Sequence, residues 1–355
     1  MKMRKAYIDN IRWLTVILVL VYHVFYIFNG AGVLGGMGGF TKVQYQDSML
    51  YFVYPWFMVL LFLISGMSSR YALTHRTHKQ FIKDRTVKLL VPSTLGLLVF
   101  QWMVGYLNIK IGGGWDMIPP VIRYPVMVFA GTGPLWFIQM LWLFSLLLVL
   151  IRKLDFEDKF YILCGKCNTG IILLLFLPIW GAAQILNMPV ATTYRFGIYF
   201  VAFLLGYFVF SHDEVQDQVQ KIHLPMLMIF IVMGISYTIY YFGQNYAADA
   251  CLKSLYTNIY LWAAILAILG CAKTWLNRTS KLTIYMTESS FGIYIVHYIV
   301  VLSVCSYLKF RTSLPVIAIY VIAVLAVVIL SPVLYEIIRR IPVLRYLVLG
   351  MKKTK

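Results

Sequence analysis

The sequence predicts an all-α, polytopic integral membrane protein, built as a bundle of about ten transmembrane helices. Hydrophobic residues make up 61% of the chain and charged residues only 12%, whereas a soluble domain carries about 25% charged residues. The mean hydropathy is +0.80. So few polar side chains cannot cover a water-soluble body, and a disordered chain or a coiled coil needs many charges. The long apolar runs also exclude an outer-membrane β-barrel, whose strands alternate apolar and polar residues.

Separate apolar runs supply the predicted helices, because a bilayer core about 30 Å thick needs roughly 20 apolar residues per crossing. The ten expected spans are residues 10–29, 49–69, 87–107, 133–151, 169–187, 194–210, 223–243, 255–275, 288–308 and 313–336. A further run, 120–130, is short, starts at two prolines and contains Arg123. It is expected to be a re-entrant or interfacial segment. No internal repeat and no break in composition divides the chain, so residues 1–355 are expected to form a single domain.

The distribution of positive charge predicts the orientation of the chain. Of the 31 Lys and Arg residues, 23 fall on the side of the N-terminus, 7 fall on the other side, and Arg12 lies inside the first span. Cytoplasmic loops carry the excess of Lys and Arg in membrane proteins, so both termini are expected in the cytoplasm. This topology accounts for the net charge of +18 without a nucleic-acid partner. No small-residue cleavage site follows the first apolar run, so we expect no cleavable signal peptide.

Two ionisable residues of the first span are candidates for chemistry, because a charged group at the bilayer centre costs about 2.5–3.5 kcal/mol. Arg12 and His23 are 11 residues apart. At about 100° per residue this spacing is within about 20° of whole turns, so both lie on one helix face, about 16 Å apart along the axis. The alternatives are an interfacial anchor for Arg12, paired with Asp9, and a hydrogen-bonded core histidine for His23.

A third ionisable residue, His297, belongs to a polar stripe in the ninth span. Ser290, Tyr294 and His297 follow the spacing i, i+4, i+7 and therefore share one helix face. This face is expected to point into the bundle. The alternative to a functional stripe is ordinary hydrogen bonding between helices.

The loop at 70–88 holds six fixed positive charges, two histidines and one acid. The excess of positive charge in cytoplasmic loops explains this composition on its own. The functional interpretation is a site for a polyanion such as a nucleotide-bearing thioester, because arginine pairs with phosphate through two parallel hydrogen bonds. Cys164 and Cys167 have the spacing of half a zinc site, but no second pair accompanies them. A metal site is therefore not expected.

The outer loops predicted at 30–48 and 108–132 have two features of their own. Six glycines fall between residues 30 and 39, which predicts a flexible first loop. Both loops also carry aromatic and polar side chains. These side chains suit contacts with a sugar, and they equally suit an aromatic belt at the membrane surface.

Several short segments, in order along the chain, resemble the motifs of one known family. They are Tyr7-Ile-Asp9-Asn-Ile-Arg12 with His23 after it, Phe57-Met-Val-Leu-Leu-Phe-Leu-Ile-Ser65-Gly66, Arg85-Thr-Val-Lys88, Pro134-Leu135-Trp136-Phe137 and Ser290-Phe-Gly-Ile-Tyr294-Ile-Val-His297. Together they resemble the acyltransferase 3 family of ten-span membrane acyltransferases. Lys88 departs from the family's RxxR motif, where it keeps the charge but loses the planar fork of arginine. Pro134 stands where many relatives have histidine.

The resemblance implies transfer of an acyl group, most often acetyl, from cytoplasmic acyl-CoA to a hydroxyl of an extracytoplasmic or lipid-linked carbohydrate at the plasma membrane. Acyl-CoA is then a co-substrate, and no permanently bound cofactor or metal is expected. The expected site residues are His23 and Arg12 for catalysis, Arg85, Lys88 and Arg70 for acyl-CoA, and His297, Tyr294 and Trp136 for the acceptor substrate.

Two questions stay open at this level. His23 suits a general base, because its ordinary pKa is near neutral, and it equally suits a transient acyl carrier. The rival functions are a transporter or flippase of a glycan or acylated glycan lipid, and a structural membrane subunit. No acidic residue falls in the middle of a predicted span, which argues against an ion-coupled transporter.

Overall fold

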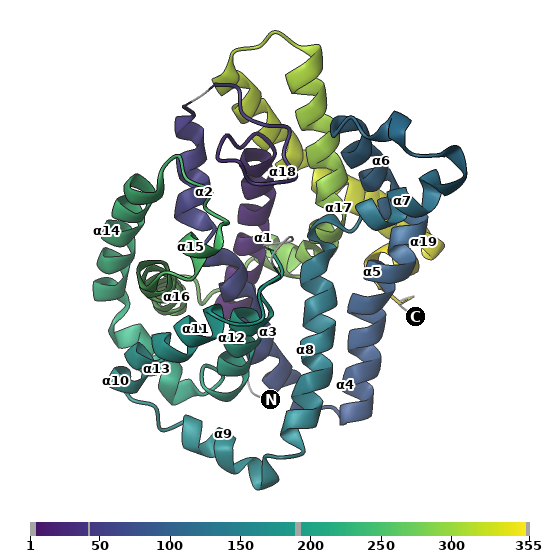
Figure 1. Cartoon of the computed structure of the whole chain (residues 1–355). Coiled ribbons are helices and arrows are strands. Elements are labelled where there is room, and N and C mark those ends of the chain that lie inside the picture. Colours follow the sequence, from purple (N-terminus) through teal and green to yellow (C-terminus); the bar gives the residue numbers. More distant parts are fainter. Residues whose placement is uncertain (1–4, 42, 189–192, 353–355) are drawn as a thin grey trace. The chain divides into compact units, whose positions relative to one another are not determined.

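The computed structural model describes residues 5–41, 43–188 and 193–352, and most of these residues are helical (Figure 1). This confirms the predicted all-α fold. The helices outside the long spans are α7 (Arg123–Ala130), α9 (Lys159–Cys164), α10 (Thr169–Leu174), α11 (Phe176–Ala183), α12 (Phe196–Phe208), α13 (Asp213–Lys221), α15 (Asp249–Leu252) and α19 (Pro342–Leu349). Lys42 and the basic residues at the extreme ends, which enter the charge count, lie outside the described residues.

Eight helical stretches of the described chain are long and apolar enough to cross a membrane. They are α1 (Ala6–Ile27), Tyr45–Leu73 with α2 (Ser48–Val53) and α3 (Phe57–Leu73), His78–Ile111 with α4 (His78–Arg85), α5 (Val91–Gly96) and α6 (Trp102–Ile111), Gly133–Arg152 with α8 (Trp136–Arg152), α14 (His223–Tyr241), α16 (Leu255–Trp275), α17 (Lys281–Arg311) and α18 (Val316–Arg340). The protein is therefore a multi-pass membrane protein, and the cytoplasmic placement of its termini stays a prediction.

The expected count of ten spans differs from this result at two places. The run at 169–187 forms two short helices, α10 and α11, rather than one span. Pro178 has no N–H, so the carbonyl of Leu174, four residues earlier, receives no helical hydrogen bond from it. The helix α10 ends at Leu174. The run at 194–210 forms α12, which continues into α13 through a bend of 108°. Counting this bent pair as one span raises the number to nine.

The described chain separates into two compact units, each with its own packing. Unit 1 contains the chain up to Thr15, Ser48–Ile82 and Leu143–Thr287. Unit 2 contains Val16–Asp47, Lys83–Trp142 and the described chain from Glu288. The expectation of one domain over residues 1–355 stays a prediction.

Close helix packing in unit 1 depends on two facing glycines. A Cβ on Gly66 of α3 would lie 1.9 Å from the carbonyl oxygen of Phe203, and one on Gly206 of α12 would lie 1.9 Å from that of Leu63. Any side chain would therefore push these helices apart, as expected for small-residue contacts between membrane helices. This contact fixes the C-terminal turns of α3, which carry Arg70. In the same unit α14 lies beside α16 (Figure 1).

In unit 2 the segment that follows α1 is held by hydrogen bonds from other residues of the unit. The ammonium of Lys309 on α17 donates to the carbonyl oxygens of Met37, Gly38 and Gly39 at 2.9, 2.6 and 3.3 Å. The Gln44 side chain donates to the carbonyl oxygen of Phe28 at 2.8 Å. The glycines that predict a flexible loop thus supply backbone carbonyls that hold it in place.

Candidate active site

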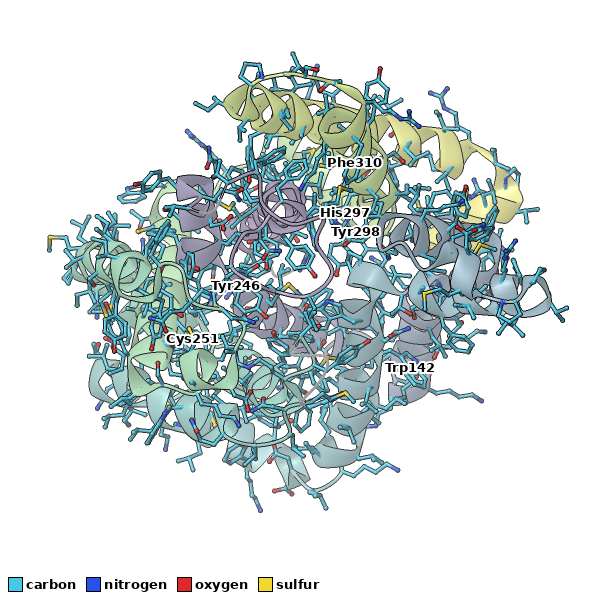
Figure 2. All side chains as sticks on the ribbon, turned by 45° about the horizontal axis from the view of Figure 1, so that its top comes forward. Trp142, Tyr246, Cys251, His297, Tyr298 and Phe310 are labelled. Carbon is cyan, nitrogen blue, oxygen red and sulfur yellow. The ribbon has the colours of Figure 1, made fainter. Side chains whose placement is uncertain are left out.

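A histidine pair lies inside unit 2, where the C-terminal half of α1 meets α17. Nε2 of His297 is 3.2 Å from Nδ1 of His23, and the ring centroids are 4.9 Å apart. Figure 2 labels His297 and its neighbour Tyr298 on α17, beside α1. The structure therefore brings together two predicted site residues that are 274 positions apart in the chain.

The backbone partners of the two rings define where their protons lie. Nδ1 of His297 is 2.6 Å from the carbonyl oxygen of Tyr294, and Nδ1 of His23 is 2.8 Å from that of Val19. A carbonyl oxygen only accepts hydrogen bonds, so each Nδ1 carries a proton when the rings are neutral. Nε2 of His297 is then an acceptor for the proton on Nδ1 of His23. Nε2 of His23 is left with its lone pair.

The second nitrogen of His23 is the uncommitted atom of this pair. His297 is fully buried, whereas His23 is half-buried. Within the described chain, Nε2 of His23 makes no hydrogen bond. Three tyrosine rings, those of Tyr22, Tyr26 and Tyr298, present themselves edge-on to His23 with centroids 5.5, 6.0 and 5.2 Å away. An imidazole with a free lone pair in an aromatic enclosure is suited to accept a proton or to attack a carbonyl carbon.

Tyr294, three residues before His297 on α17, and Trp136 belong to the same unit as this pair. The Tyr294 hydroxyl donates to the carbonyl oxygen of Pro134, and its ring centroid is 5.6 Å from that of His297. Pro134 thus connects to the α17 stripe through its backbone. Trp136 is buried at the start of α8. Ser290, the first member of the stripe, is also buried, and its hydroxyl has no hydrogen-bond partner within the described chain.

Comparison with known proteins identifies the family. The model of one protein family, described as an acyltransferase domain of the acyltransferase 3 type, matches residues 5–336. The chain belongs to the acyltransferase 3 family. This confirms the resemblance noted in the sequence and makes the protein a membrane acyltransferase. No curated protein and no solved structure matches the chain.

Arg12 of this acyltransferase is held by its own helix and by α3. Its Nη1 donates to Asp9 at 2.9 Å, and its Nη2 donates to the Ser68 hydroxyl at 2.5 Å. The contact with Asp9 is the ion pair on which the alternative to catalysis, an interfacial anchor, depends. About a third of the Arg12 side chain, 31%, stays exposed, so the guanidinium is accessible while its position is fixed.

Arg85 and Lys88 lie in unit 2 at a helical irregularity. Arg85 ends α4, and the following turn, Thr86–Leu90, has the wider π-helical spacing, which often marks functional sites. The ammonium of Lys88 lies 5.1 Å from the ring centroid of Phe291 on α17. A Cβ on Gly350, which has a φ of +62°, would lie 2.5 Å from the carbonyl oxygen of Val87. The segment around Gly350 therefore packs directly against this basic turn.

Arg70 in unit 1 has a partner that the sequence analysis misses. Its two terminal nitrogens donate to the two carboxylate oxygens of Asp158 at 3.0 and 2.9 Å, and its guanidinium stacks on Tyr161 at 3.5 Å. The only hint in the sequence is the cluster of acids at 155–158, within a predicted inner loop that is otherwise basic. The pairing spans 88 positions, so no local pattern shows it.

Proposed function

We propose that the protein is an O-acyltransferase that moves an acyl group, most simply acetyl, from cytoplasmic acyl-CoA to a hydroxyl of an extracytoplasmic or lipid-linked carbohydrate at the plasma membrane. One observation carries the proposal. His23 has an uncommitted Nε2, and its Nδ1–H faces two acceptors, the Val19 carbonyl and Nε2 of His297. This arrangement stabilises the positive charge that His23 acquires when Nε2 takes a proton.

As a general base, His23 acts in two steps. Nε2 takes the proton of the acceptor hydroxyl while the hydroxyl oxygen attacks the thioester carbonyl. The tetrahedral intermediate then expels the CoA thiolate, which takes the proton back from His23. The products are an ester and free CoA thiol, so atoms and charge balance and His23 returns to its starting state.

As an acyl carrier, His23 uses the same atom. Nε2 attacks the thioester, CoA leaves as the thiolate, and the acyl-imidazole then passes its acyl group to the carbohydrate hydroxyl. Nε2 of His297 would take the Nδ1 proton of the acylated ring and return it when the acyl group leaves for the hydroxyl oxygen. The hydroxyl proton would pass through solvent to the CoA thiolate, so the products are again an ester and free CoA thiol. Both schemes give His297 the task of orienting His23, in place of a direct contact with the acceptor.

The remaining site residues receive roles from charge and position. The phosphates of acyl-CoA need cations, and we assign them to Arg12, Arg85, Lys88 and Arg70. Tyr294 and Trp136 are proposed to shape the acceptor side. Arg12 and His23 lie near opposite ends of α1, about 16 Å apart along the axis. A donor from the cytoplasm and an acceptor from the far side need a reactive group at an intermediate depth, and His23 supplies it.

The test is release of free CoA thiol from acetyl-CoA by the purified protein in nanodiscs, with a panel of glycan acceptors. His23→Ala is the test variant. His223→Ala is the matched control, since His223 belongs to unit 1 and its Nδ1 contacts the carbonyl oxygen of Gln220 at 2.6 Å. We expect acceptor-dependent release by the wild type and by the control, and none by His23→Ala.

Two outcomes would overturn the proposal. Near wild-type release by His23→Ala would remove His23 from the chemistry. Movement of a glycan across the bilayer without acyl-CoA, together with absence of acetyl-CoA binding, would identify a transporter.

A further inference from the structure

A second cluster of charged and aromatic side chains lies in unit 1, around the Asp158 carboxylate. Arg70 donates hydrogen bonds to this carboxylate through both terminal nitrogens, and Nη2 of Arg152 lies 3.7 Å from one of its oxygens. The Arg70 guanidinium also stacks on Tyr161 and donates to the Tyr207 hydroxyl at 3.2 Å. Two fixed positive charges therefore face a single carboxylate, which leaves a positive surplus.

The other two acids of this loop make their contacts elsewhere. The Asp155 carboxylate accepts hydrogen bonds from the backbone N–H groups of Phe160 and Tyr161 at 2.8 and 3.2 Å. Glu157 pairs with Lys159 on the exposed surface. Among the described residues, Asp158 is therefore the one acid of this loop that pairs with Arg70 and Arg152.

The backbone of this loop has an unfavourable conformation at Asp158 and at the residue before it. Glu157 and Asp158 both have left-handed φ angles, +57° and +56°, which residues other than glycine rarely adopt. Asp158 also stands at the N-cap position of α9, yet its side chain makes no cap hydrogen bond, although aspartate is among the best capping residues. The carboxylate accepts hydrogen bonds from Arg70 instead.

The burial of the two partners indicates which of them a ligand reaches first. The Asp158 side chain is 34% exposed, and the Arg70 side chain is 12% exposed. The carboxylate is therefore the more exposed of the two partners. A carboxylate held by a planar arginine fork, over an aromatic ring, has the geometry with which arginine also binds a phosphate group.

We propose that Arg70 and Arg152 form a binding site for a phosphate group of the acyl-CoA donor, and that Asp158 occupies this site until the donor displaces it. The inference rests on the proposed function, because it takes acyl-CoA as the donor. It adds a regulatory feature: Asp158 competes with the donor from within the chain. Displacement would free the loop at Glu157 and Asp158 to leave its left-handed conformation.

A purely structural ion pair predicts the opposite sign for the key substitution. If Asp158 only holds the fold together, Asp158→Asn weakens unit 1 and leaves donor binding equal or poorer. If Asp158 is a competitor, its removal raises the fraction of protein that is competent to bind, and the apparent Kd falls by that factor. Asparagine tolerates the left-handed backbone well, so the substitution tests the charge rather than the loop geometry.

The experiment is calorimetric titration of CoA into the full-length protein in nanodiscs, at constant ionic strength. We expect the Kd of Asp158→Asn to be about three- to tenfold lower than that of the wild type, and the Kd of Arg70→Gln to be about tenfold higher. Glu157→Gln is the matched control. It removes the same charge from the same loop but breaks only the exposed pair with Lys159, so its Kd is expected to equal that of the wild type.

The outcomes separate the two proposals. Equal or higher Kd in Asp158→Asn, with wild-type CoA binding intact, overturns the competition and leaves the acyl-CoA donor in place. An equal gain in Glu157→Gln also overturns it, because the effect would then be one of overall charge. Absence of CoA binding in all four proteins overturns the donor itself and this site with it.

Discussion

The histidine pair in unit 2 and the arginine cluster in unit 1 handle polar groups in opposite ways. In the pair, neutral rings satisfy three of their four nitrogens and leave Nε2 of His23 uncommitted. In the cluster, Arg70 uses both terminal nitrogens and an aromatic face, and Asp158 uses both oxygens. A buried charge must be matched or it is costly, whereas a neutral imidazole can keep one atom free. Reactivity is therefore expected at the pair, and gated binding at the cluster.

The largest effect that would sharpen this contrast is expected at His297. His297→Leu removes the side-chain acceptor for Nδ1–H of His23 and leaves only the Val19 carbonyl, and we expect kcat to fall about 100-fold. His297→Gln offers an amide oxygen to the same N–H and should retain much more activity. Thiol release measured across a pH series checks this, because a loss of His23 orientation moves the pH profile as well as kcat. Equal activity of the Leu and Gln variants would mean that His297 only fills space.

The next effect is on the stability of unit 1. Arg70→Lys keeps the charge but loses the planar fork and the stacking on Tyr161. We expect it to destabilise the protein by about 1–3 kcal/mol, as for other lost hydrogen bonds to charged groups. Thermal unfolding in detergent with a tryptophan or thiol probe measures it. A Tm equal to that of the wild type would show that the bidentate geometry contributes nothing.

A smaller effect is expected at the basic turn of unit 2. Arg85→Ala removes a cation from the proposed acyl-CoA side, so KM for acyl-CoA should rise about five- to tenfold with kcat little changed. Lys83→Ala is the matched control, since Lys83 is an exposed cation on the same helix. If both variants keep the wild-type KM, the turn serves only the orientation of the chain in the membrane.

The smallest effect concerns acid stability. The hydrogen bonds from Arg70 hold the pKa of the Asp158 carboxyl below its usual range, with smaller help from the charge of Arg152. A carboxyl whose folded-state pKa is depressed adds stability above its unfolded-state pKa, about 3.9, and this stability is lost as the pH falls through the lower, folded-state value. Tm of the wild type should therefore fall more steeply below about pH 4 than Tm of Asp158→Asn. Parallel curves would contradict the pairing.

Local patterns in the sequence carry much of the predicted fold and part of the site. Runs of apolar residues predict the helices α1, α14, α16, α17 and α18 because each run must satisfy its backbone within the bilayer. Helix geometry alone places Arg12 and His23 on α1, and it groups Ser290 with His297. The same patterns predict ten spans, whereas eight or nine described stretches are long and apolar enough to cross a membrane. A run of apolar letters does not show that α10 ends at Leu174, four residues before Pro178.

Contacts between distant segments lie beyond such patterns. Whether Nδ1 of His23 has a second acceptor depends on the position of His297, and whether Arg70 is available depends on Asp158. Both answers depend on which helices pack together, because a hydrogen bond reaches only about 3 Å and is made across the packed interface. By itself the sequence determined the membrane class, most of the helical spans and the acyltransferase family. Only the tertiary structure decided which polar atoms are paired and which one remains free to react.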